Sequence, residues 1–181
     1  ICKIRYFLFN KRAHTGQSSG LNTHNINESK RPTKDDKTSQ IELYCDKREA
    51  VENTLKYTRH WLAKVSRSFA PSIAILDEPM ERSVGIAYLL CRVADTVEDE
   101  PSLTDSSRSQ LFELFIQSLH STDAAEKFSS IAGDVYANIS GQDARLMGDM
   151  QRLWNYFHLL PKSQKSAMVP HIKEMAEGMS E

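Results

Sequence analysis

The sequence predicts an all-α protein, and three observations lead to that fold class. From Ile41 onward, apolar residues recur at three- and four-residue spacing, which is the period of an amphipathic helix. No segment reads convincingly as a strand. The chain has only 7 Gly and 6 Pro among 181 residues, which is few for an all-β protein because such proteins use these residues in turns. About six helices that share apolar stripes predict an α-helical bundle.

The expected helices follow one another with short connections. The first three are expected at residues 41–64, 69–76 and about 80–98. Three more are expected to begin at Thr104 or Asp105, at Asp123 and within residues 140–143, and a last segment contains Pro170. Asp77 is the expected N-cap of the third helix, with Pro79 in its first turn. The helix that opens within 140–143 is expected to continue to Pro161. Pro170 should kink the last helix or mark its true start.

The two ends of the chain differ from the ends of a complete domain. Residues 10–40 show almost no apolar periodicity, so we interpret residues 1–40 as a disordered leader or as translated sequence upstream of the true start. At the other end, the helical pattern of Met168, Ile172 and Met179 continues to the last residues without a cap. We therefore expect residues 41–181 to be the N-terminal part of a single α-helical domain.

The composition excludes several classes of protein. A formal net charge of −1 argues against a nucleic-acid binder that works through a whole-protein basic field. No run of about 18 apolar residues is present to span a bilayer, and the mean hydropathy is −0.49. Three cysteines without a CxxC pair fit a reducing compartment such as the cytoplasm. The histidines form no HxxxH pattern, and neither common glycine-rich nucleotide loop occurs.

The third helix carries the side chains best suited to bind a ligand or take part in a reaction. Tyr88, Arg92, Asp95 and Asp99 are spaced by four, three and four residues, so they share one helix face, and Glu98 lies on its edge. Acidic side chains at a helix C-terminus are disfavoured by roughly 0.3–1 kcal/mol each, and carboxylates at i,i+4 repel each other. A bound cation reverses that cost, and carboxylates without His or Cys favour Mg²⁺, which bridges them to phosphates.

Less specific interpretations of the same residues stay open. The acidic helix end can be a solvated surface, in which Arg92 pairs with Asp95 or Glu98. The segment 66–68 can be a helix cap with a surface arginine, or a phosphate cradle of two hydroxyls and a guanidinium. The stripe of methionine and aromatic residues that contains Met150 and Trp154 is interpreted as core.

The combination of motifs is more specific than any one of them. Its parts are Ser66-Arg67-Ser68-Phe69, Glu81-Arg82, the segment YLLCRVADTVED at 88–99, and Met175-Ala-Glu-Gly178-Met179. Together they resemble the squalene/phytoene synthase family of head-to-head prenyl diphosphate synthases, over about two thirds of the chain from roughly Thr54 onward. The Asp-Thr-Val-Glu-Asp form is more similar to the squalene branch.

The resemblance implies an isoprenoid synthase fold, a helical bundle around a central cavity, and a role for each motif residue. Asp95 and Asp99 would be Mg²⁺ ligands, with Glu98 as a further candidate. The residues implied to contact diphosphate are Ser66, Arg67, Ser68 and Arg92. Arg67 and Arg92 would also lie near the phosphates of NADPH in a squalene-forming enzyme. Tyr88 would line the cavity near the reacting carbons, and Phe69 would form its apolar wall.

The implied activity is the head-to-head condensation of two prenyl diphosphates, with farnesyl diphosphate as the best-fitting substrate. Diphosphate would be lost, giving presqualene diphosphate and then squalene. A phytoene or dehydrosqualene synthase is an alternative within the family, and a terpene cyclase or a non-enzymatic helical interaction module is an alternative outside it. The family's second aspartate-rich motif should follow the GM segment beyond residue 181, so these 181 residues alone are expected to be inactive.

Partners and location follow from the same resemblance. We expect prenyl diphosphates as ligands, no nucleic acid, and a monomer in the cytoplasm. Peripheral association with a membrane surface is consistent with a hydrocarbon product. The position of Asp95, Asp99 and Arg92, at a cavity or in bulk water, discriminates the enzyme from the interaction module.

Overall fold

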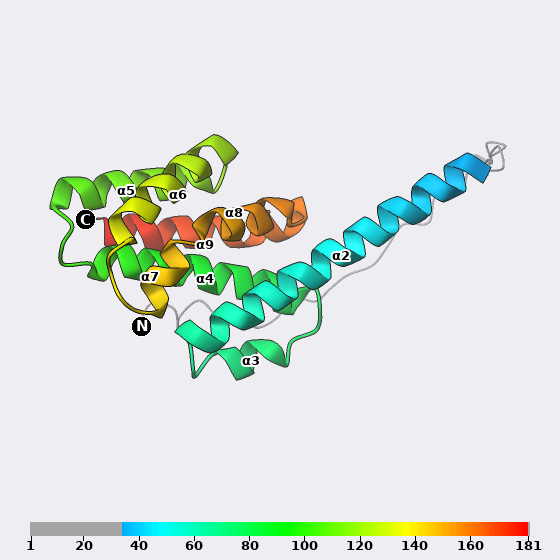
Figure 1. Cartoon of the computed structure of the whole chain (residues 1–181), viewed down its shortest axis with the longest axis horizontal. Coiled ribbons are helices and arrows are strands. Elements are labelled where there is room, and N and C mark those ends of the chain that lie inside the picture. Colours follow the sequence, from blue (N-terminus) through cyan, green and yellow to red (C-terminus); the bar gives the residue numbers. More distant parts are fainter. Residues whose placement is uncertain (1–33, 181) are drawn as a thin grey trace, which may run out of the picture.

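The computed structural model describes residues 34–180, with side chains described from residue 48 onward, and every regular element in that range is a helix (Figure 1). The helices are α2 (Lys34–Val65), α3 (Ala70–Ala74), α4 (Met80–Asp99), α5 (Asp105–Ser118), α6 (Thr122–Tyr136), α7 (Gln142–Met147), α8 (Met150–Leu159) and α9 (Lys162–Met179). The all-α prediction is confirmed. Residues 1–33 of the predicted leader lie outside the described residues. Residues 34–40 belong to α2, so this helix begins earlier than the predicted start at residue 41.

Several predicted helix ends are confirmed or corrected by the caps. Thr104 is the N-cap of α5, and its side chain accepts a hydrogen bond from Ser107 N at 3.1 Å. Ser121, rather than Asp123, caps α6 and accepts from Ala124 N at 3.3 Å. Asp77 is not the cap of α4, because that helix begins after Pro79 without a side-chain capping bond.

The long helix predicted up to Pro161 is in fact two helices. It is interrupted at Gly148 and Asp149, where α7 ends and α8 begins. Asp149 accepts a hydrogen bond from Trp61 Nε1 at 3.0 Å, a tertiary contact that links the break to α2. Apolar spacing continues across the break, so periodicity alone did not indicate it.

The final helix corrects two further expectations. Pro170 lies inside α9, which begins at Lys162, so this proline is not the start of the helix. It is on the exposed side, where water can pair the carbonyl that a proline leaves unbonded. The helix ends at Met179 with Ser180 as its C-cap, whereas the sequence pattern indicated no cap.

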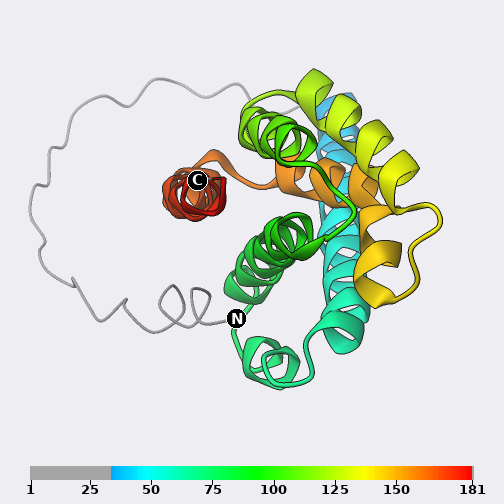
Figure 2. The same ribbon diagram turned by 90° about the vertical axis from the view of Figure 1, so that its left-hand side faces the viewer.

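The helix α4 lies at the centre of the bundle, with α3, α5, α9 and α2 around it (Figure 2). Leu89, Leu90, Val93 and Ala94 of this helix are completely buried. Gly85 is the point of closest approach to α2, since a Cβ built there would lie 3.2 Å from the Thr58 Cβ. The sequence of α4 thus fixes it as the element against which the others pack, as its nearly continuous apolar composition predicts.

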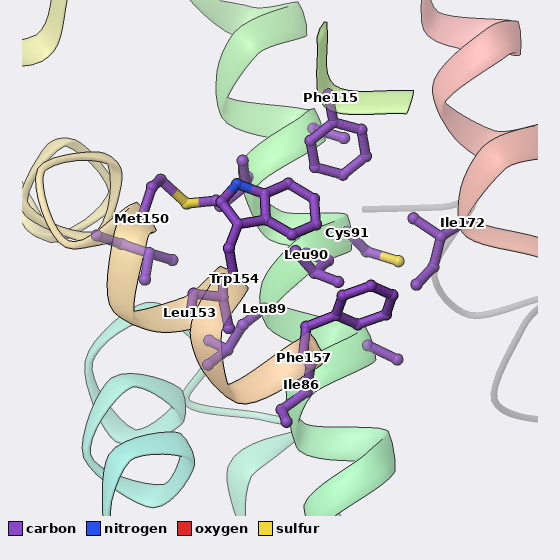
Figure 3. Close-up of a cluster of buried hydrophobic side chains, with 14 of the residues drawn as sticks. Ile86, Leu89, Leu90, Cys91, Phe115, Met150, Leu153, Trp154, Phe157 and Ile172 are labelled. Atoms are coloured by element: carbon purple, nitrogen blue, oxygen red, sulfur yellow. The ribbon is translucent and has the colours of Figure 1, made fainter. Parts of the chain in front are cut away.

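An aromatic cluster fills the core between α4, α5, α6 and α8 (Figure 3). The Trp154 ring centroid is 5.4 Å from that of Phe115, 6.1 Å from Phe128 and 5.8 Å from Phe157. All four side chains are at most 1% exposed. The interpretation of the methionine and aromatic stripe as core is therefore confirmed. None of the described helices is both long enough and apolar enough to cross a membrane.

Candidate diphosphate and metal site on helix α4

Asp95 is the carboxylate of the acidic motif that the fold buries. Its side chain sits on the central helix, the residue is 5% exposed, and its Oδ2 atom has no hydrogen-bond partner among the residues that the structure describes. Burial raises the pKa of Asp95, and the nearby carboxylates of Asp99 and Glu98 act in the same direction, while Arg92 opposes them. Among the described residues, Arg92 is the group that favours the ionised form of this carboxylate.

The donor set at this end of α4 fits a hard cation. Asp95 offers an unpartnered carboxylate oxygen, while Glu98 and Asp99 are exposed one turn further along. Burial raises the pKa of the neighbouring Cys91 thiol to about 12, so it stays protonated and is a poor metal ligand. Within residues 48–180, no three His, Cys, Asp or Glu side chains come together as a metal cluster. Mg²⁺ with one or two protein carboxylates needs substrate oxygens and water to complete its shell.

Arg92 makes a two-point ion pair with a residue from another helix. Its Nε donates to Asp143 Oδ1 at 2.9 Å and its Nη2 donates to Asp143 Oδ2 at 2.8 Å. The pair raises the pKa of Arg92, which keeps the guanidinium charged. The interpretation that Arg92 pairs with Asp95 or Glu98 is corrected by this contact, because Asp143 takes both bonds.

Tyr88, Phe69 and Ser66 gather where the α2–α3 connection meets α4. The Tyr88 and Phe69 ring centroids are 5.4 Å apart. Ser66 is buried, and its hydroxyl accepts from Phe69 N at 3.3 Å. Burial raises the pKa of Tyr88, so the phenol stays neutral. The predicted apolar wall and the predicted cavity tyrosine are thus brought together.

Arg67 and Ser68 are placed differently from Ser66. Both are exposed in the turn between α2 and α3, and neither side chain bonds to another described residue. The segment 66–68 is therefore split, with one hydroxyl inside the fold and a guanidinium and a second hydroxyl at its surface.

A pocket of about 170 Å³ opens beside the C-terminal half of α4. It is lined by Arg92, Thr96, Asp99, Glu100, Tyr136, Ile139, Ser140, Gly141, Asp143 and Ala144. Tyr136 donates its hydroxyl proton to Thr96 O at 3.0 Å and so fixes one wall. Arg92 and Asp99 line this pocket, whereas Asp95 is buried and does not line it.

Sequence reasoning missed Asp143 and Tyr136 as parts of this region. Asp143 is 51 residues after Arg92, and Tyr136 is 40 residues after the Thr96 carbonyl that it bonds. Neither residue belongs to a motif with a local spacing. The packing of α7 on α4, and of α6 on α7, brings them to the site.

The chain is similar to proteins of one known family. The family model described as squalene/phytoene synthase matches residues 62–181. Squalene synthase from Bos taurus is 26% identical over 133 residues, which cover 74% of this chain and 30% of the bovine protein. Squalene synthase from Rattus norvegicus is 32% identical over 92 residues, covering 48% of this chain and 22% of the rat protein.

A solved structure shows the same fold. The structure of TcSQS in complex with the ligand BPH1237 superposes with a TM-score of 0.57 at 28% identity, covering 71% of this chain and 35% of that one. The chain thus spans about a third or less of the length of these relatives. The family model covers most of the chain and includes the whole acidic motif of α4. The chain belongs to the squalene/phytoene synthase family.

Proposed function

We propose that this chain supplies the first half of the active site of a prenyltransferase that joins two farnesyl diphosphates head to head. The observation that carries the proposal is the buried Asp95 carboxylate, whose Oδ2 has no partner among the described residues. A chain under selection for stability alone would place an apolar or paired residue there. A magnesium–diphosphate complex gives this oxygen the positive partner that it lacks.

Each residue of the site has a task in this proposal. Asp95 and Asp99 would hold Mg²⁺, with Glu98 at its edge, and the ion would neutralise charge on the departing diphosphate. The N–H groups of Arg92 that Asp143 leaves free would bind diphosphate oxygens. Ser66, Ser68 and Arg67 would contact the diphosphate from the opposite side.

The aromatic groups have a different task, which is to surround the reacting carbons. The Tyr88 and Phe69 rings pack against each other beside the buried face of α4. Their π faces stabilise positive charge on an allylic group, and their apolar bodies exclude water that would capture it. The Tyr88 phenol, whose pKa is raised by burial, suits this role because an ionised phenol would itself be a nucleophile.

The squalene branch is proposed because the matched proteins reported above are squalene synthases. NADPH would supply the hydride for a squalene product, and the exposed Arg67, which has no partner among the described residues, would be available for a cofactor phosphate. A phytoene or dehydrosqualene product is the alternative within the family. Analysis of the product from the enzyme that contains this segment separates the two.

Calorimetric titration with farnesyl diphosphate tests the proposal on these 181 residues. Binding should require Mg²⁺, and Asp95→Asn should weaken it by at least tenfold, because it removes a metal ligand without changing side-chain size. Asp134→Asn, which removes an exposed carboxylate on α6, is the matched control and should bind like the wild type. Equal binding with and without Mg²⁺, or unchanged binding by Asp95→Asn, would contradict the proposal.

The same preparations can be assayed for squalene with Mg²⁺ and NADPH. We expect no sustained turnover, because the proposal assigns further metal ligands to a second aspartate-rich motif that these 181 residues do not contain. Sustained squalene formation would show that one acidic motif is enough.

A further inference from the structure

The ion pair between Arg92 and Asp143 leaves part of the guanidinium free. Asp143 accepts from Nε and from Nη2, at 2.9 and 2.8 Å. A guanidinium has five N–H groups, so both protons of Nη1 and one of Nη2 remain unused by this pair. Arg92 can therefore bind a second anion at its free edge while Asp143 stays in place.

Asp143 is held rigidly enough to act as a support. It lies in the first turn of α7, two residues after Gly141, whose φ of 127° is a conformation that favours glycine. The same helix buries Ala144, Leu146 and Met147 and packs on α4, α2 and α6. Backbone and core packing thus place the Asp143 carboxylate at the wall of the pocket that Arg92 also lines.

Without Asp143, Arg92 has an obvious competing partner. Asp95 is three residues further along the same helix, and its buried Oδ2 is unpartnered. A guanidinium at i,i+3 from a carboxylate ordinarily pairs with it. In the structure Arg92 instead pairs across helices with Asp143, and the Asp95 Oδ2 atom has no hydrogen-bond partner within the described part of the chain.

We infer that Asp143 is a positioning residue that keeps Arg92 away from Asp95 and aims its free N–H groups at the diphosphate. The inference rests on the proposed function. It adds a residue outside the motifs, on a helix whose part in the site no motif indicates. Asp143 does not touch the diphosphate itself; it acts through the geometry of Arg92.

The direction of the change in diphosphate affinity distinguishes a positioning role of Asp143 from an effect of its negative charge alone. Asp143 is an anion beside an anion site, so removing its charge should strengthen diphosphate binding if only long-range electrostatics mattered. Positioning predicts the opposite result. The Asp143→Asn variant should weaken diphosphate binding by about tenfold. The upper limit is roughly thirtyfold, which corresponds to the conformational entropy lost when a whole arginine side chain is fixed in one rotamer.

The experiment is a calorimetric titration of this chain with inorganic pyrophosphate in the presence of Mg²⁺. Wild type, Asp143→Asn, Arg92→Ala and the double variant form a double-mutant cycle. Asp134→Asn is the matched control, since it removes an exposed carboxylate on α6 that does not line the pocket. It removes one negative charge and should leave affinity unchanged or raise it. In the Arg92→Ala background, Asp143→Asn should cause no further loss.

A second readout follows the side chain directly. In ligand-free protein, NMR relaxation of the Arg92 Nε–Hε group should show an ordered guanidinium in the wild type and a mobile one in Asp143→Asn. The midpoints of thermal unfolding of the two proteins should be equal. If Asp143→Asn binds pyrophosphate as tightly as the wild type while Arg92→Ala binds weakly, the positioning role is overturned and the proposed function stands. If Arg92→Ala also binds normally, Arg92 is not a diphosphate ligand, and both fail.

Discussion

Asp95 is a residue whose ionisation costs stability in the folded chain. Burial raises its pKa, so its ionised form is less favourable in the folded state than in the unfolded state. For a carboxyl group with a raised pKa, the associated stability is present at low pH and is lost as the pH rises through the folded-state pKa. An aspartate at this position therefore lowers the free energy of unfolding at neutral pH unless a cation binds.

Asp95→Asn should accordingly stabilise the ligand-free protein at neutral pH by about 0.5–1 kcal/mol, the scale of the helix-end and i,i+4 repulsions that it removes. The gain should shrink as the pH is lowered, because the wild-type carboxyl then becomes neutral too. Urea unfolding at a series of pH values measures this. Asp134→Asn controls for loss of a surface carboxylate, and a less stable Asp95→Asn at neutral pH would contradict the account.

At this scale the sequence allowed part of the site to be predicted. The spacing of Tyr88, Arg92 and Asp95 placed them on one helix face, and the structure brings Tyr88 beside Phe69 as expected. The partner of Arg92 could not be predicted in this way. Local spacing offered Asp95 and Glu98, whereas packing of α7 on α4 brings in Asp143 from 51 residues away.

At the scale of elements, the close crossing of α2 over α4 positions the site. The crossing depends on the missing side chain of Gly85, where even a Cβ would lie 3.2 Å from the Thr58 Cβ. The α2–α3 connection that carries Ser66 follows from this crossing, as does the contact of Phe69 with Tyr88. A larger residue at position 85 should therefore affect both packing and the site.

Gly85→Val should destabilise the protein by about 1–3 kcal/mol, because the added branches overpack the helix crossing. Gly133→Ala is the informative comparison, since nothing lies within 4 Å of a Cβ there and the residue is inside α6. That change should stabilise the protein by about 0.5–1 kcal/mol through helix propensity. Thermal or urea unfolding measures both, and a neutral Gly85→Val would show that the crossing can relax.

Helix boundaries show where sequence patterns stop being informative. The Thr104 cap was predictable because a hydroxyl precedes an amphipathic run and caps locally. The break at Gly148 and Asp149 was not, because apolar spacing runs through it and its Asp149–Trp61 bond is tertiary. Pro170 does not mark the start of α9, since an exposed proline can sit within a helix whose other face is packed.

For the whole molecule, the fold class followed from periodicity, and the family followed from the combination of motifs. The bundle closes on an aromatic core around Trp154, which the methionine and aromatic stripe indicated. What periodicity could not give is the relative placement of helices, and hence the pocket between α4, α6 and α7. The candidate site therefore forms only when the bundle assembles, although most of its candidate functional side chains belong to α4.

The central claim is that the Asp95 face of α4 receives a divalent cation together with a diphosphate. Paramagnetic broadening by Mn²⁺ and pyrophosphate, measured residue by residue in NMR spectra, tests it most directly. The account predicts strong broadening centred on the amides of residues 92–99 in the wild type and its loss in Asp95→Asn. Broadening centred elsewhere, or unchanged by that substitution, would contradict it.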